Sequence, residues 1–177
     1  MRDELLRAAV AVLQQDGAAA FTLRRVTEEA GCSTTGVYTY FGGKQGLVDA
    51  IFVAGFDSFD DALSDALAGD DLEAAGRAYR RWALDNPTHY MVMFGRAVPE
   101  YEPSAEAMDR ALASFVGLTD SVARVGGEPG AAERAYHLFA TIHGYVMLEM
   151  SGMGAPTPST PDELYERALA SLTAVEG

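Results

Sequence analysis

Apolar side chains recur every three or four positions along most of the chain, which is the spacing of amphipathic helices. In the first fifty residues this pattern is interrupted at Asp16-Gly17, Gly31 and Gly42-Gly43. Because glycine commonly follows the last turn of a helix, these breaks separate helices. The pattern predicts helices over about residues 1–16, 22–31 and 33–41, and a long one from 44 to a turn at residues 69–71.

The second half of the chain continues in the same way. Asn86-Pro87 predicts a helix start, with a capping residue followed by proline at the first helical position. One helix is bracketed by Glu102-Pro103 and residues 126–129, and residues 131–150 form the next. Residues 160–163, Thr-Pro-Asp-Glu, read as a capping box that opens a last helix. Strand alternation does not persist anywhere, and no internal repeat is found, so the expected class is all-α.

Composition limits the class of protein. The 177 residues suffice for one sizeable domain, or for a small domain joined to a medium one, and 49% hydrophobic with 22% charged residues is an ordinary globular balance. No apolar run reaches the roughly 18 residues of a membrane span, and the charged N-terminal helix does not resemble a signal peptide. The single cysteine, Cys32, excludes an internal disulfide and suits the cytoplasm. We favour a packing role for it over a reactive one.

The net charge of −13 at first argues against nucleic acid as a partner. Its distribution changes that conclusion. Residues 1–45 carry five basic and five acidic side chains, whereas the rest of the chain carries eight and 21. The first segment is therefore neutral, which permits phosphate contact without making a basic patch.

Residues 22–41 have the pattern of a helix-turn-helix. Val26, Ala30 and Val37 supply buried contacts, Thr27 is small where the two helices approach, and Gly31 stands where the turn needs a positive φ. Ser33 or Thr34 is expected to cap the second helix of the pair.

The outer face of that second helix is polar but uncharged. Thr34, Thr35, Tyr38 and Thr39 fall on one side of a helical wheel, opposite Val37. Hydroxyl and phenol groups hydrogen-bond to phosphates and base edges, and threonine methyl groups can touch thymine methyl groups. The alternative is a solvated face that happens to be rich in threonine.

Two helix starts near this face could hold phosphate. Lys44 opens the long helix, where free backbone N–H groups and the helix dipole already favour an anion. Thr22 and Arg24 stand at the start of the first helix of the pair. Taken alone, Lys44 would be an ordinary surface lysine.

The run from Phe21 to Leu47, FTLRRVTEEAGCSTTGVYTYFGGKQGL, resembles the DNA-binding domain of tetracycline-repressor-type (TetR family) regulators over residues 3 to about 50. The chain departs from the family pattern at Tyr40, usually histidine, and at Thr27, usually alanine. The resemblance implies a homodimer whose third helices enter successive major grooves of a roughly palindromic operator in double-stranded DNA. By position, the implied DNA-binding residues are Thr22, Arg24, Ser33, Thr34, Thr35, Gly36, Tyr38, Thr39, Tyr40 and Lys44. Thr34, Thr35 and Thr39 would lie nearest the bases. Phosphates would be held by Thr22, Tyr38, Tyr40 and Lys44, and Arg24 could do either.

Two later stretches, residues 79–95 and 139–149, resemble a TetR C-terminal domain type named for a tryptophan, histidine and glycine motif. His143 and Gly144 match that motif, while Phe139 takes the place of the tryptophan. We therefore expect a small DNA-binding domain over residues 1–46 and a helical ligand-binding and dimerisation domain over residues 47–177.

Aromatic and methionine side chains of the second domain are candidates for lining a cavity for an apolar ligand with one hydrogen-bonding group. They are Phe56, Tyr79, Trp82, Met91, Met93, Phe94, Phe115, Phe139, His143 and Met147. Each of them taken singly is more often a core residue, and a buried histidine bonded to a carbonyl is commoner than a ligand contact.

Helix 131–150 is apolar on nearly all sides, so it needs cover on more than one. Packing beside the last helix and against a second copy would satisfy it, and the alternative is a helix central to a monomeric bundle. The expected dimer contacts are Tyr145, Leu148, Leu164, Tyr165, Ala168, Leu169 and Leu172.

The sequence contains no motif that supports an enzymatic function. His137 and His143 lie on different sides of their helix and cannot share a metal, and no phosphate-binding glycine loop or nucleophile motif occurs. We expect no catalytic residue, no metal and no cofactor. The predicted function is a cytoplasmic TetR-family repressor, released from its operator by a small, largely apolar ligand. The alternative is a helical small-molecule-binding protein that has lost DNA binding.

Overall fold

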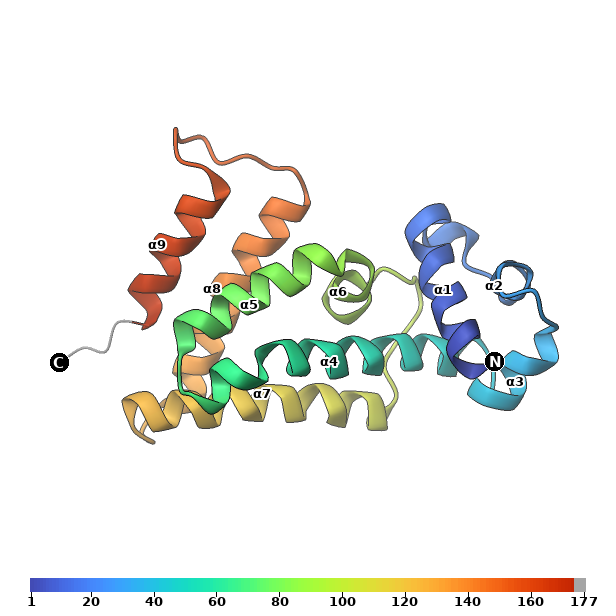
Figure 1. Cartoon of the computed structure of the whole chain (residues 1–177), viewed down its shortest axis with the longest axis horizontal. Helices are drawn as coiled ribbons and strands as arrows, with labels where there is room; N and C mark the ends of the chain where they lie inside the picture. The colour runs from blue at the N-terminus through green and yellow to red at the C-terminus, as the bar shows by residue number, and fades with distance from the viewer. Residues whose placement is uncertain (174–177) are drawn as a thin grey trace. The chain divides into compact units, whose positions relative to one another are not determined.

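The structure is a computed structural model that describes residues 1–173, and every regular element within them is helical. The all-α class is therefore confirmed. Among these residues, no helix has both the length and the apolar composition that a membrane crossing needs. In chain order the helices are α1 (Arg2–Asp16), the 3-10 turn Ala18–Ala20, α2 (Leu23–Glu29), α3 (Thr34–Phe41), α4 (Lys44–Ala68), α5 (Leu72–Asp85), α6 (Pro87–Phe94), α7 (Ala105–Gly126), α8 (Ala131–Met150) and α9 (Pro161–Thr173) (Figure 1).

The chain divides into two compact units. The first comprises Met1–Ser58 and Asn86–Ala111, and the second comprises Phe59–Asp85 and Leu112–Gly177. Helices α4 and α7 contribute residues to both units.

The core of the first unit begins with three short helices, α1, α2 and α3, which gather in one group in Figure 1. Leu5, Ala9 and Val12 of α1 are fully buried, as the apolar spacing of this helix requires. Val26 of α2 and Val37 of α3 are buried with them at 0% exposure. One apolar stripe from each helix therefore makes the core, which leaves the opposite side of α3 to solvent.

Local chemistry fixes where these helices begin and end. The Thr22 hydroxyl accepts a hydrogen bond from the Arg25 backbone N–H at 3.2 Å, which confirms the predicted N-cap. Gly31 has φ +64° in the turn between α2 and α3, the left-handed conformation that glycine was expected to supply. Ser33 occupies the N-cap position of α3 but makes no capping hydrogen bond with its side chain.

The segment between α6 and α7 is fastened to the first turns of α4 within the same unit. The Tyr101 hydroxyl donates to Asp49 Oδ1 at 2.8 Å, and the Ser104 backbone N–H donates to the same oxygen at 3.1 Å. The Gln45 side-chain amide donates to the Glu102 carbonyl. The first two turns of α4 are thus held by the α6–α7 segment.

The second unit is built on α5, α8 and α9, and α8 and α9 run side by side in it (Figure 1). Tyr165 of α9 is 1% exposed and its hydroxyl donates to the Gly76 carbonyl of α5 at 2.6 Å. Arg80 of α5 donates to both carboxylate oxygens of Glu149 on α8, each at 2.8 Å, and to Asp162 of α9 at 2.6 Å. One arginine therefore joins three helices.

Two further helix starts predicted from sequence are confirmed. Asn86 is the N-cap of α6 with Pro87 at its first position. Thr160 and Glu163 form the capping box of α9, since the Thr160 hydroxyl accepts from the Glu163 N–H at 3.2 Å and the Glu163 carboxylate accepts from the Thr160 N–H at 2.9 Å.

Candidate nucleic-acid interface

The exposed side of α3 carries the residues that sequence analysis singled out. Thr34, Thr35 and Thr39 are exposed, and Tyr38 and Tyr40 expose 61% and 46% of their surface. Rings this exposed lose free energy in water that a contact with a partner could recover. The helix therefore presents hydroxyl, methyl and aromatic groups together, without a charged side chain between Gly31 and Phe41.

The helix-turn-helix geometry follows from the turn. The Thr27 hydroxyl donates to the Arg24 carbonyl at 3.0 Å, and its side chain is only 4% exposed, so a small residue at this crossing is confirmed. The Cys32 N–H donates to the Thr27 carbonyl at 3.0 Å and closes the turn. Cys32 itself is partly buried, as a packing residue would be.

Gly36 differs from the other predicted DNA-binding residues of α3 in what it faces. A Cβ at this position would lie 3.4 Å from Leu5 Cδ1 of α1, so Gly36 faces the neighbouring helix of its own unit. Gly36 is therefore less accessible to DNA than the predicted threonine contacts, because α1 partly covers its surface.

Lys44 is the first residue of α4, directly after Gly42 with φ +71° and Gly43 with φ +134°. Its ammonium lies 5.6 Å from the ring centroid of Phe21, an arrangement that orients the side chain without neutralising it. The first N–H groups of a helix have no acceptor within the helix. Lys44 therefore adds a full positive charge where α4 already favours an anion.

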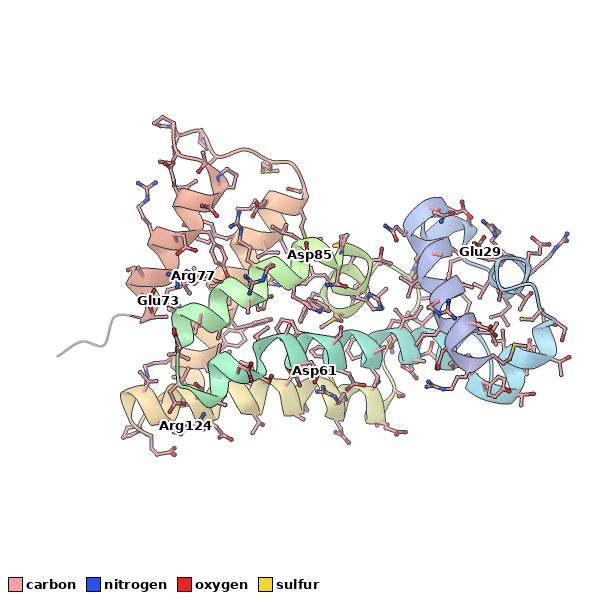
Figure 2. The ribbon with its side chains drawn as sticks, viewed as in Figure 1. Glu29, Asp61, Glu73, Arg77, Asp85 and Arg124 are labelled. Atoms are coloured by element: carbon pink, nitrogen blue, oxygen red, sulfur yellow. The ribbon has the colours of Figure 1, made fainter. Side chains whose placement is uncertain are left out.

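The two arginines of α2 are paired with carboxylates. Arg24 donates to Glu28 at 2.8 Å, and Arg25 donates to Asp16 at 2.7 Å and to Glu29 at 2.9 Å (Glu29 is labelled in Figure 2). The Arg25 side chain is 33% exposed and joins α2 to the end of α1, which is a structural contact. The Arg24 side chain is 87% exposed, so its pair with Glu28 can open toward a phosphate.

Comparison with known proteins decides the family. Residues 5–51 match the model of bacterial regulatory proteins of the tetR family, and residues 72–172 match that of the tetracyclin repressor-like, C-terminal domain. The second match alone covers more than half of the chain. The chain belongs to the TetR family.

Solved structures and curated sequences are also similar to this chain. Among the solved structures, SCO4313 has a TM-score of 0.86 and 26% identity, with 97% of this chain and 94% of that one covered. A protein with unknown function from Rhodococcus sp. RHA1 has a TM-score of 0.80 and 26% identity, over 97% and 93% of the two chains. The HTH-type transcriptional regulator Rv1816 of Mycobacterium tuberculosis is 27% identical over 92% of this chain and 86% of the relative.

This TetR-family chain is thus a transcriptional regulator with a DNA-binding helix-turn-helix, as predicted. The narrower C-terminal type, named for tryptophan, histidine and glycine, stays a prediction. Within residues 1–173 the His, Cys, Asp and Glu side chains make no cluster that could hold a metal ion.

The predicted ligand-lining residues of the TetR-family chain fall into two groups, one in each unit. In the first unit, Phe56 packs edge-on against Phe94 at 5.7 Å, and Met93 packs so closely on α4 that a Cβ at Gly55 would lie 2.6 Å from its sulfur. Met91 lies beside Gly95 at the end of α6. Phe56 and Met93 are therefore core residues of the first unit.

The second group surrounds a polar pair in the second unit. The Tyr79 hydroxyl lies 3.2 Å from His143 Nδ1, and the His143 ring stacks on Phe139 at 5.5 Å. Burial lowers the pKa of His143, because the charged imidazolium would lose its hydration there. Phe139 also makes edge contacts with Tyr79 and Phe115, each at 6.4 Å between ring centroids. The other two predicted residues of this group are Trp82, which is buried, and Met147, which is partly exposed.

The predicted dimer contacts separate by exposure. Leu148 is 50% exposed, and Tyr145, Leu164, Ala168 and Leu172 are partly exposed. Tyr165 and Leu169 are 1% and 0% exposed, so their prediction as contacts to a second copy was wrong. Both side chains point into their own unit, where Leu169 fills the space beside Gly76 and Tyr165 bonds to its carbonyl.

Sequence reasoning missed a small-residue face on α8. Ala140 is exposed, and Gly144 is partly exposed with no atom within 4 Å of where its Cβ would be. With the half-exposed Leu148 they follow one another at intervals of four residues, so all three lie on one face of the helix. The four-residue spacing of Ala140, Gly144 and Leu148 in the sequence could have indicated it.

Proposed function

We propose that this TetR-family regulator is a cytoplasmic repressor that binds a palindromic operator as a homodimer and is released by a small, largely apolar ligand. The functional division is residues 1–46 for DNA and residues 47–177 for ligand binding and dimerisation. The observation that carries the DNA-binding part is the exposed, uncharged face of α3 next to the free positive charge of Lys44.

Within that interface, each side chain has a role that its chemistry supports. Thr34, Thr35 and Thr39 face base edges from α3. Thr22, Tyr38, Tyr40 and Lys44 bind phosphate oxygens, through hydroxyl groups and the ammonium, and Ser33 does the same from the N-cap position. Arg24 gives up Glu28 to bind either a phosphate or a base edge.

The homodimer is proposed to form through α8 and α9 from each copy. Ala140 and Gly144 leave room for close approach of a symmetry-related helix, and Leu148 supplies apolar surface that is otherwise half exposed. A self-complementary patch of this kind is what a two-fold interface requires. Sedimentation of the full chain tests this, and a strictly single-chain species at micromolar concentration would contradict it.

For ligand binding, the Tyr79–His143 pair offers a neutral hydrogen-bonding group amid the rings of Phe115 and Phe139. Such an arrangement suits an apolar molecule with one polar group. Because α4 has residues in both units, we propose that it transmits the effect of the ligand to the DNA-binding domain. The ligand acts as an inducer only if it binds the DNA-incompetent state more tightly than the competent one.

The experiment starts with the full-length protein and sheared DNA from its source genome. Fragments that remain bound are sequenced, and the shared sequence is tested by gel shift at several salt concentrations. A regulator of this kind selects a two-fold-symmetric sequence. Recovery of fragments without any shared sequence would refute the proposal and favour the helical binding protein without DNA function.

Lys44→Ala then tests the phosphate contact. Loss of one contact is expected to weaken binding to all sequences and to reduce the slope of log affinity against log salt by about one. Arg167→Ala is the matched control, since it removes one positive charge from an exposed position on α9. An unchanged slope in Lys44→Ala, or an equal change in the control, would rule out the contact.

A further inference from the structure

The base-reading face of α3 lacks the side chains that discriminate bases by paired hydrogen bonds. Guanine is read chiefly by arginine or lysine and adenine by asparagine or glutamine, because these side chains reach two atoms of one base edge. Residues 31–41 contain none of these four residue types. Single hydroxyl contacts and apolar contacts are the remaining means of telling one base pair from another.

Apart from Arg24, which is 87% exposed on α2, and Lys44 at the start of α4, the neighbouring long side chains are held by contacts of their own. Arg25 is bonded to Asp16 and Glu29, and the Gln45 amide donates to the Glu102 carbonyl. Neither is available to supply the missing paired contact without giving up bonds in the same unit.

Thr39 offers mainly its methyl group. Its hydroxyl donates to the Thr35 carbonyl one turn earlier at 2.9 Å, so its only proton is already used. What remains for a base is one acceptor oxygen and the Cγ2 methyl group. Thymine is the only base that presents a methyl group in the major groove.

We infer that this regulator, if it binds an operator through α3 as proposed above, recognises it chiefly through thymine C5-methyl groups, with Thr39 as a specificity-determining residue and the exposed Tyr38 ring beside it. The operator half-site is therefore expected to contain thymines opposite α3 whose methyl groups, rather than their hydrogen-bonding edges, carry the discrimination.

Replacing thymine by deoxyuridine tests this directly, because it removes the methyl group and leaves base pairing unchanged. In the operator selected from genomic DNA, thymines are replaced one at a time. Burial of a methyl group contributes about 0.8 kcal/mol, so each contacted thymine should cost roughly a fourfold loss of affinity. Thymines outside the half-sites serve as controls and should cost nothing.

A pair of variants assigns the effect to Thr39. Thr39→Val keeps methyl groups and removes the hydroxyl, whereas Thr39→Ser keeps the hydroxyl and removes the methyl. We expect Thr39→Val to bind the thymine operator like wild type and to keep the deoxyuridine penalty. Thr39→Ser should bind about fourfold more weakly and become indifferent to deoxyuridine at one position, the coupling that defines a direct contact. Circular dichroism of both full-length variants checks that they are folded.

The outcomes separate this inference from the proposed function. A specific operator whose affinity is unaffected by deoxyuridine would overturn methyl recognition and leave the repressor proposal intact. The same holds if Thr39→Ser binds normally and Thr39→Val does not, because the hydroxyl would then carry the contact. Failure to select any shared sequence would remove both.

Discussion

Among the charged residues of the second unit, Arg80 is the one whose replacement should lower stability the most. Its side chain is only 16% exposed, Glu149 is 22% exposed, and the two form a bidentate pair. Its guanidinium also lies 5.3 Å from the ring centroid of Tyr165, whereas its partner Asp162 is 69% exposed and adds little. Removing a charged partner from a half-buried pair leaves the other charge poorly solvated, which costs about 2 kcal/mol.

The variant is Arg80→Met, which keeps an unbranched apolar side chain and removes the charge. In a chain of this length, about 2 kcal/mol lowers Tm by roughly 4–8 °C. Thermal and urea unfolding followed by circular dichroism measure the change at one fixed chain concentration, because dimer formation would make Tm depend on concentration. Arg81→Met, at an exposed position on the same helix, controls for the loss of charge.

A double-mutant cycle with Glu149→Gln completes the test. If the two residues stabilise each other, the double variant should be less destabilised than the sum of the single ones by about 1–2 kcal/mol. The reasoning is refuted if Arg80→Met and Arg81→Met unfold at the same temperature, or if the effects of Arg80→Met and Glu149→Gln are additive.

Two further perturbations test packing and burial. Gly76→Ala would place a methyl group 3.0 Å from Cδ2 of the fully buried Leu169 and closer still to Cδ1, so it should destabilise the chain by about 1 kcal/mol even after the gain in helix propensity. Gly117→Ala, in α7 with no atom within 4 Å, should instead stabilise the chain by up to about 1 kcal/mol. Urea unfolding measures both changes, and a change of the same sign in both variants would contradict the packing described. Because burial lowers the pKa of His143 below its unfolded value of about 6.5, the native state binds fewer protons than the unfolded one, so stability is complete above pH 6.5 and falls as the pH drops below it. His143→Gln should show a smaller loss between pH 7 and pH 5, retaining only the part that His89 contributes through the same effect, and a pH profile equal to that of the wild type would place His143 in water.

Local signals in the sequence predicted most of the helix boundaries. Thr22 and the Thr160–Glu163 capping box act on atoms within three residues, and Pro87 fixes its own φ at the first position of α6, so the sequence alone contains each signal. The turn at Gly31 is of the same kind, since glycine adopts its φ of +64° at no steric cost. The exposed face of α3 follows from the buried stripe opposite it.

The parts that sequence reasoning missed depend on contacts between distant residues. An amphipathic α9 is compatible with burial against its own chain or against a second copy, and the hydrophobic pattern is identical in both cases. Tyr165 and Leu169 were assigned to a partner for that reason, although Gly76, 89 residues earlier than Tyr165, provides the space and the carbonyl that bury them. The bond from Arg80 to Glu149 spans 69 residues and has no local signature.

The lack of charge on α3 and the excess of acidic residues over 46–177 both reduce the attraction of the chain to DNA of any sequence. Attraction to phosphates regardless of sequence grows with the number of positive side chains that reach the DNA, and residues 1–45 carry five, of which Arg24 and Arg25 are paired with carboxylates. The other 132 residues carry an excess of acidic groups that repels DNA beyond the interface. We therefore expect weak non-specific binding, and an operator affinity that depends mainly on contacts that only the right sequence provides. A recognition helix made of threonine and tyrosine is sufficient under these conditions. Specificity is the ratio of operator affinity to non-specific affinity, so a low non-specific affinity raises it as effectively as a high operator affinity does.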